Sequence, residues 1–341
     1  MKNIAADNQK SPFFLTKFWF DTLARIVFPD RKRLDLECNN QKLPHIITST
    51  KFLFLKLRTL RSLTNFYSPE FLPETAGDAL ENKGISSYYK SIEDTNRFDL
   101  IDLNPLSEKN ADSVIAVLEG KNFFCEKYQS NTNWTHPDIS SADEFWNLRS
   151  SKMKNILKSK KNKLFRDCEC EVEISTKADE SEVNKLLSDY HDVYNRSWKN
   201  NEPYTDFINC IAKEENTKGN LRIGILKCNG RAVAAQIWFI YNSTAYIFKL
   251  SYDNSLRSES VGSILMEAMF NHVIVEDKVT NIDFLTGDDK YKADWMTCSR
   301  GLFGVKAYNK KTIKGFICIL CIKAKAAFKS AKDKQAPPKN D

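Results

Sequence analysis

The sequence has no long apolar run. Its first ten residues, Met-Lys-Asn-Ile-Ala-Ala-Asp-Asn-Gln-Lys, do not resemble a signal peptide, and no segment approaches the roughly 20 apolar residues that a membrane-spanning helix needs. With 341 residues, of which 42% are hydrophobic, the chain can bury a large core and form two domains of ordinary size. We therefore expect a globular, cytoplasmic protein.

Metal-ligand patterns are also lacking. His191 and His272 lie in helical patterns without Cys, Asp or Glu at ligand spacing. The nine cysteines are an odd number, which argues against a complete disulfide framework. Cys318 and Cys321 form a C-x-x-C pair without a second pair, inside the apolar run 316–322. Small buried side chains explain this pair better than zinc or redox chemistry, so we expect reduced cysteines and no metal.

Acidic residues are absent from one stretch that carries eight basic ones, although the net charge of the whole chain is only +7. The eight are Arg149, Lys152, Lys154, Lys158, Lys160, Lys161, Lys163 and Arg166. A solvated helix that connects two domains accounts for most of them. The alternative is an electrostatic funnel for an anionic ligand, such as a nucleotide sugar, a phospholipid-linked sugar or RNA. No aromatic residue precedes Phe165 in this stretch, which makes nucleic acid the weaker ligand.

Helix and strand signals alternate along the chain, and they are clearer in the second half. The turn Asn229-Gly230 between two apolar runs is the strongest short-range hairpin signal. In the first half we expect a helix capped by Thr16, strands at 34–38 and 43–48 about the turn Asn39-Asn40, a helix at 113–120, a strand at 123–128 and a loop at 131–141. In the second half we expect strands at 170–175, 221–227, 232–241, 244–250 and 282–285, and helices near 183–194 and 260–275. This order predicts an α/β protein with a mixed sheet covered by helices.

The segment from Ser258 to Trp295 is the most informative one. It joins a Ser/Gly turn that opens a helix to a strand that ends in Gly287 and a cluster of titratable side chains. The unpaired N–H groups and the dipole of a helix start favour an anion. The segment therefore predicts a site for a phosphate-bearing cofactor.

Five motifs follow one another around this segment. They are Arg196-Ser-Trp198, Asn229-Gly-Arg-Ala-Val-Ala-Ala-Gln236, Tyr252-Asp253, Ser260-Val-Gly-Ser-Ile-Leu265 and Asp283-Phe-Leu-Thr-Gly-Asp-Asp-Lys-Tyr-Lys292. In this order they resemble the GNAT acyltransferase superfamily. More narrowly, the chain is similar to the branch associated with bacterial cellulose and exopolysaccharide biosynthesis (CelD/BcsL-like), whose members carry two tandem GNAT-like halves. The resemblance is strongest over residues 172–308.

The resemblance implies two tandem GNAT-like (acyl-CoA N-acyltransferase) domains, each a mixed, mostly antiparallel sheet flanked by helices. We place an N-terminal GNAT-like domain at 1–145, a basic connecting helix at 146–168, a C-terminal acyltransferase domain at 169–325 and a disordered basic tail at 326–341. The approach to this tail, 311–332, is basic and partly amphipathic, so we expect either peripheral contact with an acidic membrane or packing of 316–322 on the domain.

Acyl-CoA is the cofactor that the resemblance implies, as acetyl-CoA or a longer acyl-CoA. GNAT enzymes bind its pyrophosphate at a Q/R-x-x-G-x-G/A loop, and 257–262 fits that frame, except that Ser260 replaces the middle glycine and Glu259 adds a negative charge. The residues expected to bind the cofactor are Leu250, Ser251, Arg257, Ser260, Val261, Gly262 and Ser263. An ordinary helix N-cap by Ser258 or Ser260 is the alternative explanation.

Acyl transfer from a thioester needs a donor for the oxyanion, a route for the proton of the nucleophile and an acid for the leaving thiolate. In this superfamily the backbone near the end of the fourth strand, here 249–251, supplies the first. Tyr291 falls where the family places the acid, or it packs in the core. Asp288 or Asp289 is expected to act as base, or to cap the helix of Tyr291. Trp198, Asp253 and Lys292 are the residues expected to bind substrate.

We therefore expect an enzyme that moves an acetyl or acyl group from acyl-CoA to an amino or hydroxyl group of a sugar-containing acceptor in bacterial polysaccharide biosynthesis. The expected partners are acyl-CoA and an amino-sugar or glycan. Two other classes stay open. One is a Fem-like peptidyltransferase that uses aminoacyl-tRNA, although the chain lacks the long helical hairpin of many such enzymes. The other is a non-catalytic GNAT-fold binding module.

Overall fold

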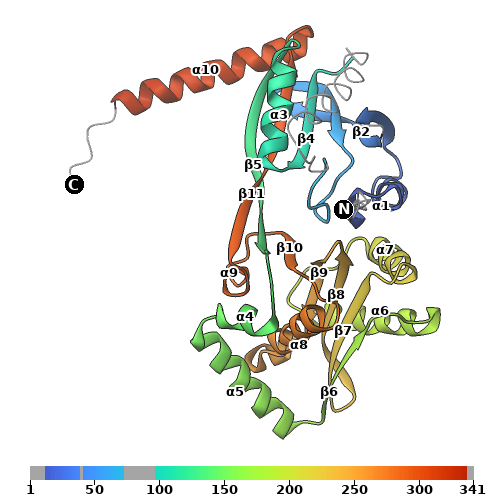
Figure 1. Cartoon of the computed structure of the whole chain (residues 1–341). Coiled ribbons are helices and arrows are strands. Elements are labelled where there is room, and N and C mark those ends of the chain that lie inside the picture. Colours follow the sequence, from blue (N-terminus) through green and yellow to red (C-terminus); the bar gives the residue numbers. More distant parts are fainter. Residues whose placement is uncertain (1–11, 39–40, 73–96, 336–341) are drawn as a thin grey trace, which may run out of the picture. The chain divides into compact units, whose positions relative to one another are not determined.

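The computed structural model describes residues 12–38, 41–72 and 97–335, and the chain divides into two compact units (Figure 1). Unit 1 is made of residues 1–27 and 131–300, and unit 2 of residues 28–130 and 301–341. Each unit thus takes in two separate stretches of chain, whereas the expected boundaries at 145 and 169 enclose contiguous domains. The tandem arrangement of two GNAT-like domains stays a prediction.

A mixed sheet forms the centre of unit 1, with strand order β5-β10-β9-β8-β7-β6. Its strands are β5 (Phe123–His136, of which 131–136 belong to this unit), β6 (Cys170–Ser175), β7 (Leu221–Cys228), β8 (Arg231–Tyr241), β9 (Thr244–Tyr252) and β10 (Asn281–Thr286). β9 and β10 are parallel, and the other paired neighbours are antiparallel. Asn229 and Gly230 both adopt positive φ, 51° and 76°, in the tight turn between β7 and β8. The predicted α/β class with a mixed sheet is confirmed.

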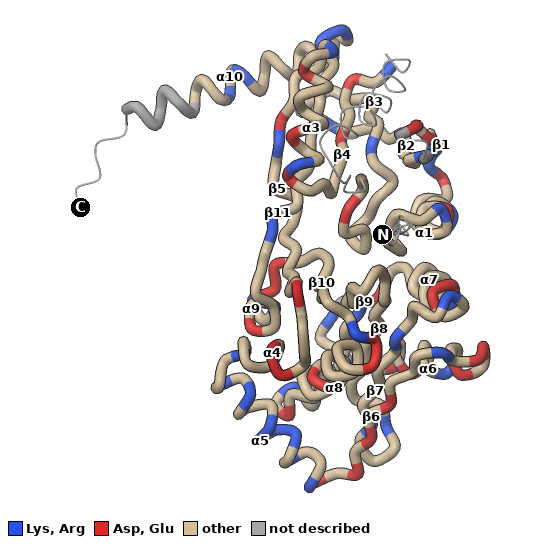
Figure 2. The backbone as a smooth tube through the Cα atoms, in the orientation of Figure 1, with Lys and Arg blue, Asp and Glu red and all other residues tan. Residues whose placement is uncertain are grey.

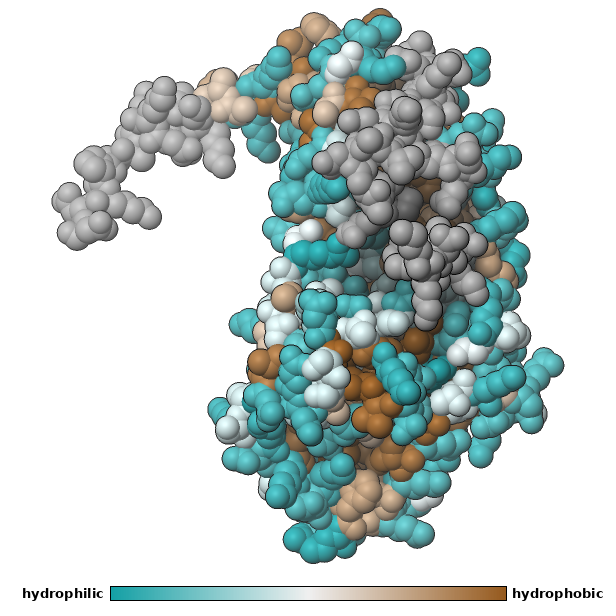
Figure 3. Space-filling view, viewed as in Figure 1, coloured by the Kyte–Doolittle hydropathy of each residue, from teal (hydrophilic) through white to brown (hydrophobic). Residues whose placement is uncertain are grey.

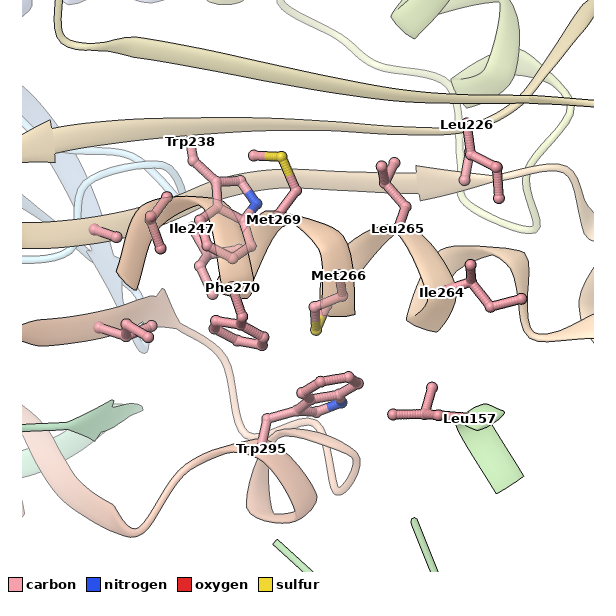
Figure 4. Packing of buried hydrophobic residues seen from close by; sticks show 14 of the residues in the cluster. Leu157, Leu226, Trp238, Ile247, Ile264, Leu265, Met266, Met269, Phe270 and Trp295 are labelled. Carbon is pink, nitrogen blue, oxygen red and sulfur yellow. The ribbon is translucent and has the colours of Figure 1, made fainter. Parts of the chain in front are cut away.

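Helices flank this sheet. They are η1 (Phe13–Leu15), α1 (Lys17–Thr22), η2 (Leu23–Val27), α4 (Ala142–Asn147), α5 (Ser151–Asp167), α6 (Glu180–Asn195), α7 (Thr205–Thr217), η3 (Asn254–Glu259), α8 (Val261–Val275) and α9 (Lys292–Trp295). One side of α8 packs on the sheet, and Trp295 and Leu157 lie on its other side (Figure 4). A Cβ at Gly224 of β7 would lie 2.5 Å from Met269 Sδ, so glycine there lets α8 approach the strand closely.

The predicted loop at 131–141 is wrong over its first half, because β5 continues to His136. This part of β5 pairs antiparallel with β10, with Thr135 opposite Asp283. Its polar residues suggested a loop, yet the Asn133 side chain is buried and hydrogen-bonded to β10. The tertiary partner of the strand therefore overrides its weak local propensity.

The N-terminal segment packs into unit 1. Thr16 caps α1 as predicted, since its hydroxyl accepts a hydrogen bond from the Trp19 N–H at 3.2 Å. Phe13 is 1% exposed, and its ring lies 4.7 Å from the Phe239 ring and 5.9 Å from the Phe248 ring, centroid to centroid. The first described residues thus pack on β8 and β9 of the sheet of unit 1.

Unit 2 contains a second set of strands in the order β1-β2-β3-β4-β11-β5, with β3 and β4 parallel. Its elements are β1 (Lys32–Cys38), β2 (Gln41–Phe52), β3 (Leu55–Ser62), β4 (Leu100–Leu106), α3 (Glu108–Glu119), β11 (Cys298–Asn309, from 301 onward) and α10 (Ile313–Gln335). The strands predicted at 34–38 and 43–48 are confirmed, and the Asn39-Asn40 turn lies outside the described residues. The helix predicted at 113–120 begins earlier, where Ser107 caps it.

The helix α10 continues through Gln335, so 326–335 is helical where the sequence suggested a disordered tail, and 336–341 lies outside the described residues. Cys318 and Ile319 are buried against unit 2, whereas Phe316, Leu320 and Phe328 are exposed. Figure 3 shows that the face of the molecule that it draws carries both hydrophilic and hydrophobic residues. None of the helices in the described parts of the chain is long and apolar enough to cross a membrane. Peripheral contact of α10 with an acidic membrane stays a prediction.

Replacement of Phe13 by alanine is expected to destabilise unit 1. The variant loses a buried aromatic side chain that six other aromatic rings surround, which typically costs about 3–5 kcal/mol. Urea unfolding followed by tryptophan fluorescence measures the loss. Phe54→Ala is the control because Phe54 is 80% exposed. Equal unfolding midpoints for the two variants would show that the N-terminal segment does not stabilise the unit.

Candidate functional site

Two neighbouring parallel strands stop pairing and separate within unit 1. β9 and β10 pair over three residues only, ending with Tyr246 opposite Asp283. Two residues later β9 has a bulge, because Lys249 and Ile247 face consecutive residues of β8 and Phe248 between them has no partner there. We call the diverging ends, Phe248–Tyr252 of β9 and Phe284–Thr286 of β10, the β9/β10 fork.

Backbone groups of Leu250 point into the fork. The Asp253 N–H donates to the Val233 carbonyl of β8 at 2.8 Å. Because backbone groups alternate sides along a strand, those of Leu250, three residues earlier, point away from β8. The Lys199 ammonium accordingly donates a hydrogen bond to the Leu250 carbonyl. The Leu250 N–H lies on the same side of the strand as this carbonyl.

A buried polar network shapes the β10 side of the fork. Leu285 adopts a left-handed φ of 56°, which is uncommon for a branched residue, and its N–H donates to Asp283 Oδ1 at 2.6 Å. Asn133 Nδ2 donates to Asp283 Oδ1 at 2.7 Å and to the Leu285 carbonyl at 2.8 Å. Arg300 Nε donates to Asn133 Oδ1 at 2.8 Å. Burial raises the pKa of Asp283 above its ordinary value despite these hydrogen bonds.

The Lys292 side chain is hydrogen-bonded to the backbone of the turn after β10. This side chain is 5% exposed, and Nζ donates to the carbonyls of Thr286 at 2.9 Å, Gly287 at 3.1 Å and Phe284 at 3.4 Å. Burial lowers the pKa of Lys292, and the nearby Asp289 carboxylate opposes that shift. Lys292 was predicted to bind substrate, and the structure gives its ammonium three backbone partners instead of an outward-facing position.

Tyr291 is the N-cap residue of α9, directly beside this turn. Its ring packs edge-on against Phe284 at 6.1 Å between centroids, and 41% of the residue is exposed. Burial raises the pKa of Tyr291, and electrostatic interactions with Asp289 and Tyr252 raise it further. The hydroxyl thus stays protonated at neutral pH and can donate a proton, and it lies within the electrostatic reach of β9.

The two candidate carboxylates differ in their surroundings. Asp288 Oδ1 accepts a hydrogen bond from Trp134 Nε1 at 3.2 Å. Asp289 lies 3.9 Å from Lys292 Nζ, and its side chain is 58% exposed. The helix-capping alternative finds no support here, since Tyr291 occupies the N-cap position of α9 and no side-chain capping hydrogen bond is present there.

Sequence reasoning missed two further basic groups at the fork. Lys249 Nζ forms a buried ion pair with Glu202 Oε2 at 2.6 Å. Lys199 comes from the segment after α6, and burial, followed by the charge of Lys249, lowers its pKa to about 8. A single lysine in an irregular segment carries no local signal, so only the fold identifies it.

The start of α8 has the geometry of an anion-binding turn. Ser260 adopts φ 58° and ψ 31°, the left-handed conformation that a glycine would favour, and its side chain makes no capping hydrogen bond. Helix geometry leaves the N–H groups of Val261 and Gly262 without intrahelical acceptors. A Cβ at Gly262 would lie 2.9 Å from the Tyr252 ring, so glycine allows α8 to approach the end of β9. Gln236 of β8 donates to the Gly262 carbonyl at 3.0 Å and fixes this approach.

Basic residues run along α5 (Figure 2), and two of its lysines neutralise carboxylates near this turn. Lys163 Nζ lies 3.1 Å from Glu259 Oε2, and Lys161 Nζ lies 2.8 Å from Glu267 Oε2. Hydrogen bonding from Lys163 lowers the pKa of Glu259. The repulsion expected from Glu259 is therefore compensated. Lys152 and Lys158 of the same helix are exposed to solvent, as a solvated helix predicts.

Asp253 organises the chain between β9 and α8. It caps η3 by accepting from the Ser255 N–H at 3.0 Å, and it accepts a short hydrogen bond from Arg196. Burial favours a raised pKa for Asp253, but the hydrogen bonds from Ser255 and Arg196 outweigh it and lower the pKa. Trp198 is 59% exposed. The motif Arg196-Ser-Trp198 thus combines a structural arginine with a solvent-facing aromatic ring.

The structure brings most predicted site residues into one region of unit 1. Leu250 and Ser251 lie on β9 at the fork, Ser260 is the N-cap residue of α8, and Val261 to Ser263 form the start of that helix. The Tyr291 ring contacts Phe284 on the β10 side of the fork. Within the described ranges, no group of three or more His, Cys, Asp or Glu side chains is placed to hold a metal ion. The groups of this region that can form hydrogen bonds or transfer protons include backbone groups, lysine side chains and the Tyr291 hydroxyl.

Comparison with known families gives the following result. Residues 151–293 match the family model described as an acetyltransferase (GNAT) domain. The matched residues include the β9/β10 fork and the start of α8. This part of the chain is therefore similar to a GNAT acetyltransferase domain. No curated protein matches the sequence. The narrower likeness to the CelD/BcsL branch stays a prediction.

Solved structures share the fold at low sequence identity. FemX superposes with a TM-score of 0.56 and 10% identity, covering 88% of this chain and 92% of FemX. A conserved protein of unknown function from Bacteroides thetaiotaomicron gives a TM-score of 0.54 and 13% identity, covering 86% and 90% of the two chains. The C-terminal domain of a putative lysylphosphatidylglycerol synthetase from Agrobacterium fabrum gives 0.53 and 9%, covering 90% and 95%. These likenesses show a common fold.

Replacement of Gly287 by alanine is expected to disturb the turn beside the fork. Gly287 has φ 120°, a conformation that costs other residues about 1–3 kcal/mol, and a Cβ there would lie 2.9 Å from Lys292 Nζ. Gly230→Ala is the matched control because Gly230 has φ 76° and no atom near the added Cβ. Thermal unfolding of both variants measures the difference, and an equal loss would mean that Lys292 needs no room at Gly287.

Proposed function

We propose that this protein is an acyl-CoA-dependent N-acyltransferase. It moves an acetyl or longer acyl group to an amino or hydroxyl group of a sugar-containing acceptor in bacterial polysaccharide biosynthesis. The observation that carries the proposal is the β9/β10 fork next to the anion-ready turn at Ser260, inside the segment that matches a GNAT acetyltransferase domain. Acyl-CoA carries a thioester and a pyrophosphate in one molecule, so its binding needs a reaction point and an anion site close together.

The start of α8 is the proposed pyrophosphate site. The N–H groups of Val261 and Gly262 and the helix dipole favour an anion there. The left-handed backbone at Ser260 keeps the turn open in the way that a glycine would. Arg257 adds positive charge at the same turn, and the Lys163 ion pair removes the repulsion of Glu259. These residues fit a pyrophosphate despite the replaced glycine.

The β9/β10 fork is the proposed place of the reaction. The Leu250 N–H would stabilise the oxyanion that forms when the acceptor attacks the thioester carbonyl. The Tyr291 hydroxyl, which is protonated at neutral pH, would then protonate the departing thiolate. Trp198, exposed beside Lys199, is the proposed contact for a sugar ring of the acceptor.

Calorimetric and thermal-shift titrations test the donor site. Acetyl-CoA, a longer acyl-CoA and aminoacyl-tRNA are added in turn to the full chain. Ligand at 100 times its dissociation constant adds about 2.7 kcal/mol to the free energy of unfolding, so binding raises the melting temperature. We expect stabilisation by acyl-CoA. Stabilisation by aminoacyl-tRNA alone would support the Fem-like peptidyltransferase, and none with any donor would support a non-catalytic module.

Ser263→Asp locates the pyrophosphate. A carboxylate in the first turn of α8 interacts favourably with the helix dipole, so the fold is expected to keep its stability, while repulsion of the pyrophosphate lowers acyl-CoA affinity roughly tenfold, about 1.4 kcal/mol. Ser151→Asp, in the first turn of α5, is the control for net charge. Unchanged affinity in Ser263→Asp would move the donor site away from α8.

Tyr291→Phe is expected to lower turnover with little change in acyl-CoA affinity. The phenyl ring keeps its packing against Phe284, and only the hydroxyl that protonates the thiolate is lost. Loss of an acid catalyst typically lowers kcat about 10²–10⁴-fold. A coupled assay for released thiol measures kcat and KM. Normal turnover in this variant would assign Tyr291 to packing.

A further inference from the structure

Three lysines meet at the β9/β10 fork, and their partners differ. Lys249 is paired with the Glu202 carboxylate at 2.6 Å, and Lys292 is held by three backbone carbonyls. Lys199 Nζ makes one hydrogen bond within the described structure, to the Leu250 carbonyl, and lies 5.8 Å from the centroid of the Tyr194 ring. Lys199 is thus the lysine whose nitrogen keeps hydrogen-bonding capacity for a ligand.

The position of Lys199 is fixed on the fork side of β9. The Leu250 carbonyl and N–H point into the fork, so a group that hydrogen-bonds this carbonyl stands beside the place where the thioester carbonyl would meet the Leu250 N–H. Lys199 also directly follows Trp198, the exposed aromatic residue. The lysine is therefore adjacent in the chain to the proposed acceptor contact and is hydrogen-bonded at the proposed reaction point.

The surroundings of Lys199 favour its neutral form more than the surroundings of an ordinary lysine do. The pKa of Lys199 is lowered to about 8; burial is the largest cause, and the charges of Lys249 on β9 and Lys292 on α9 act in the same direction. Asp289 opposes the shift. Glu202 is engaged by Lys249, and the Tyr194 ring is uncharged in this range. A substantial fraction of Lys199 is therefore an amine at pH 7 to 8, with a lone pair that can accept a proton.

We propose that Lys199 is the general base of the acyl transfer, an assignment that rests on the proposed function. As the acceptor amine or hydroxyl forms its bond to the thioester carbon, the Lys199 amine takes the proton of the nucleophile and becomes an ammonium. The carbon–sulfur bond then breaks, and Tyr291 protonates the thiolate. Lys199 returns its proton to solvent and Tyr291 regains one, so that both are restored for the next turnover.

Lys199 suits this role better than the two aspartates of the turn after β10. The Asp288 carboxylate accepts a hydrogen bond from Trp134 Nε1, and the Asp289 side chain is 58% exposed beside Lys292. A base is most effective when its pKa lies near the working pH. The Lys199 amine meets this condition.

Lys199→Arg separates proton transfer from charge. A guanidinium keeps the positive charge and can still donate to the Leu250 carbonyl, but it cannot lose its proton in this pH range. We expect kcat to fall roughly 10²–10⁴-fold, the inflection near pH 8 in the kcat profile to disappear, and the KM for acyl-CoA to stay within about twofold. Lys185→Arg, on the exposed face of α6, is the matched control.

The outcomes distinguish this assignment from the proposed function. Acyl transfer by the unaltered protein with the same pH profile in Lys199→Arg overturns the role of Lys199 alone. No transfer by the unaltered protein, to any amino-sugar or glycan acceptor across the pH range, overturns the proposed function. Labelling with trinitrobenzenesulfonate, read by mass spectrometry, adds a measurement without turnover: we expect a Lys199 midpoint near pH 8 and protection by acyl-CoA. A midpoint near 10.5, the ordinary value, overturns the assignment.

Discussion

The short pairing between β9 and β10 is the constraint on which the proposed site depends. After three residue pairs the two strands follow different partners, β9 along β8 and β10 along β5. Each strand bulges where it turns away, and backbone hydrogen-bonding groups of Leu250 are thereby left to side chains and ligands. Because an unsatisfied backbone group is costly when buried, the protein fills this position with the Lys199 ammonium.

Buried positive charge is the second property of the site, and its cost is distributed unevenly. Removing an ammonium from water is unfavourable unless partners replace the solvent. The Glu202 carboxylate provides a full opposite charge for Lys249, and the dipoles of three backbone carbonyls stabilise the Lys292 ammonium. Lys199 receives one carbonyl, so desolvation is less compensated there and its pKa falls the furthest toward neutrality. The same fold therefore turns one of three chemically identical side chains into a base.

Local patterns in the sequence predicted the elements of the second half well. The Asn229-Gly230 hairpin, α8 and β10 all begin within two residues of their predicted limits, because turn chemistry and apolar periodicity act over short distances. α7 was not predicted, and residues 131–136 were taken for a loop. The strand there is polar because Asn133 is needed to hold Asp283 and the bulge of β10, a reason that lies 150 residues away in the chain.

The sequence by itself determined the α/β class, the turn at Ser260 and the presence of Tyr291 after β10. It could not show that Ser260 takes the backbone conformation of a glycine, nor that Lys163 compensates Glu259 across 96 residues. Only the tertiary structure decided that Lys199 meets Leu250, 51 residues later, at the β9/β10 fork. The physical reason is that sheet register and helix packing set which distant groups share a desolvated space, and no local pattern encodes that choice.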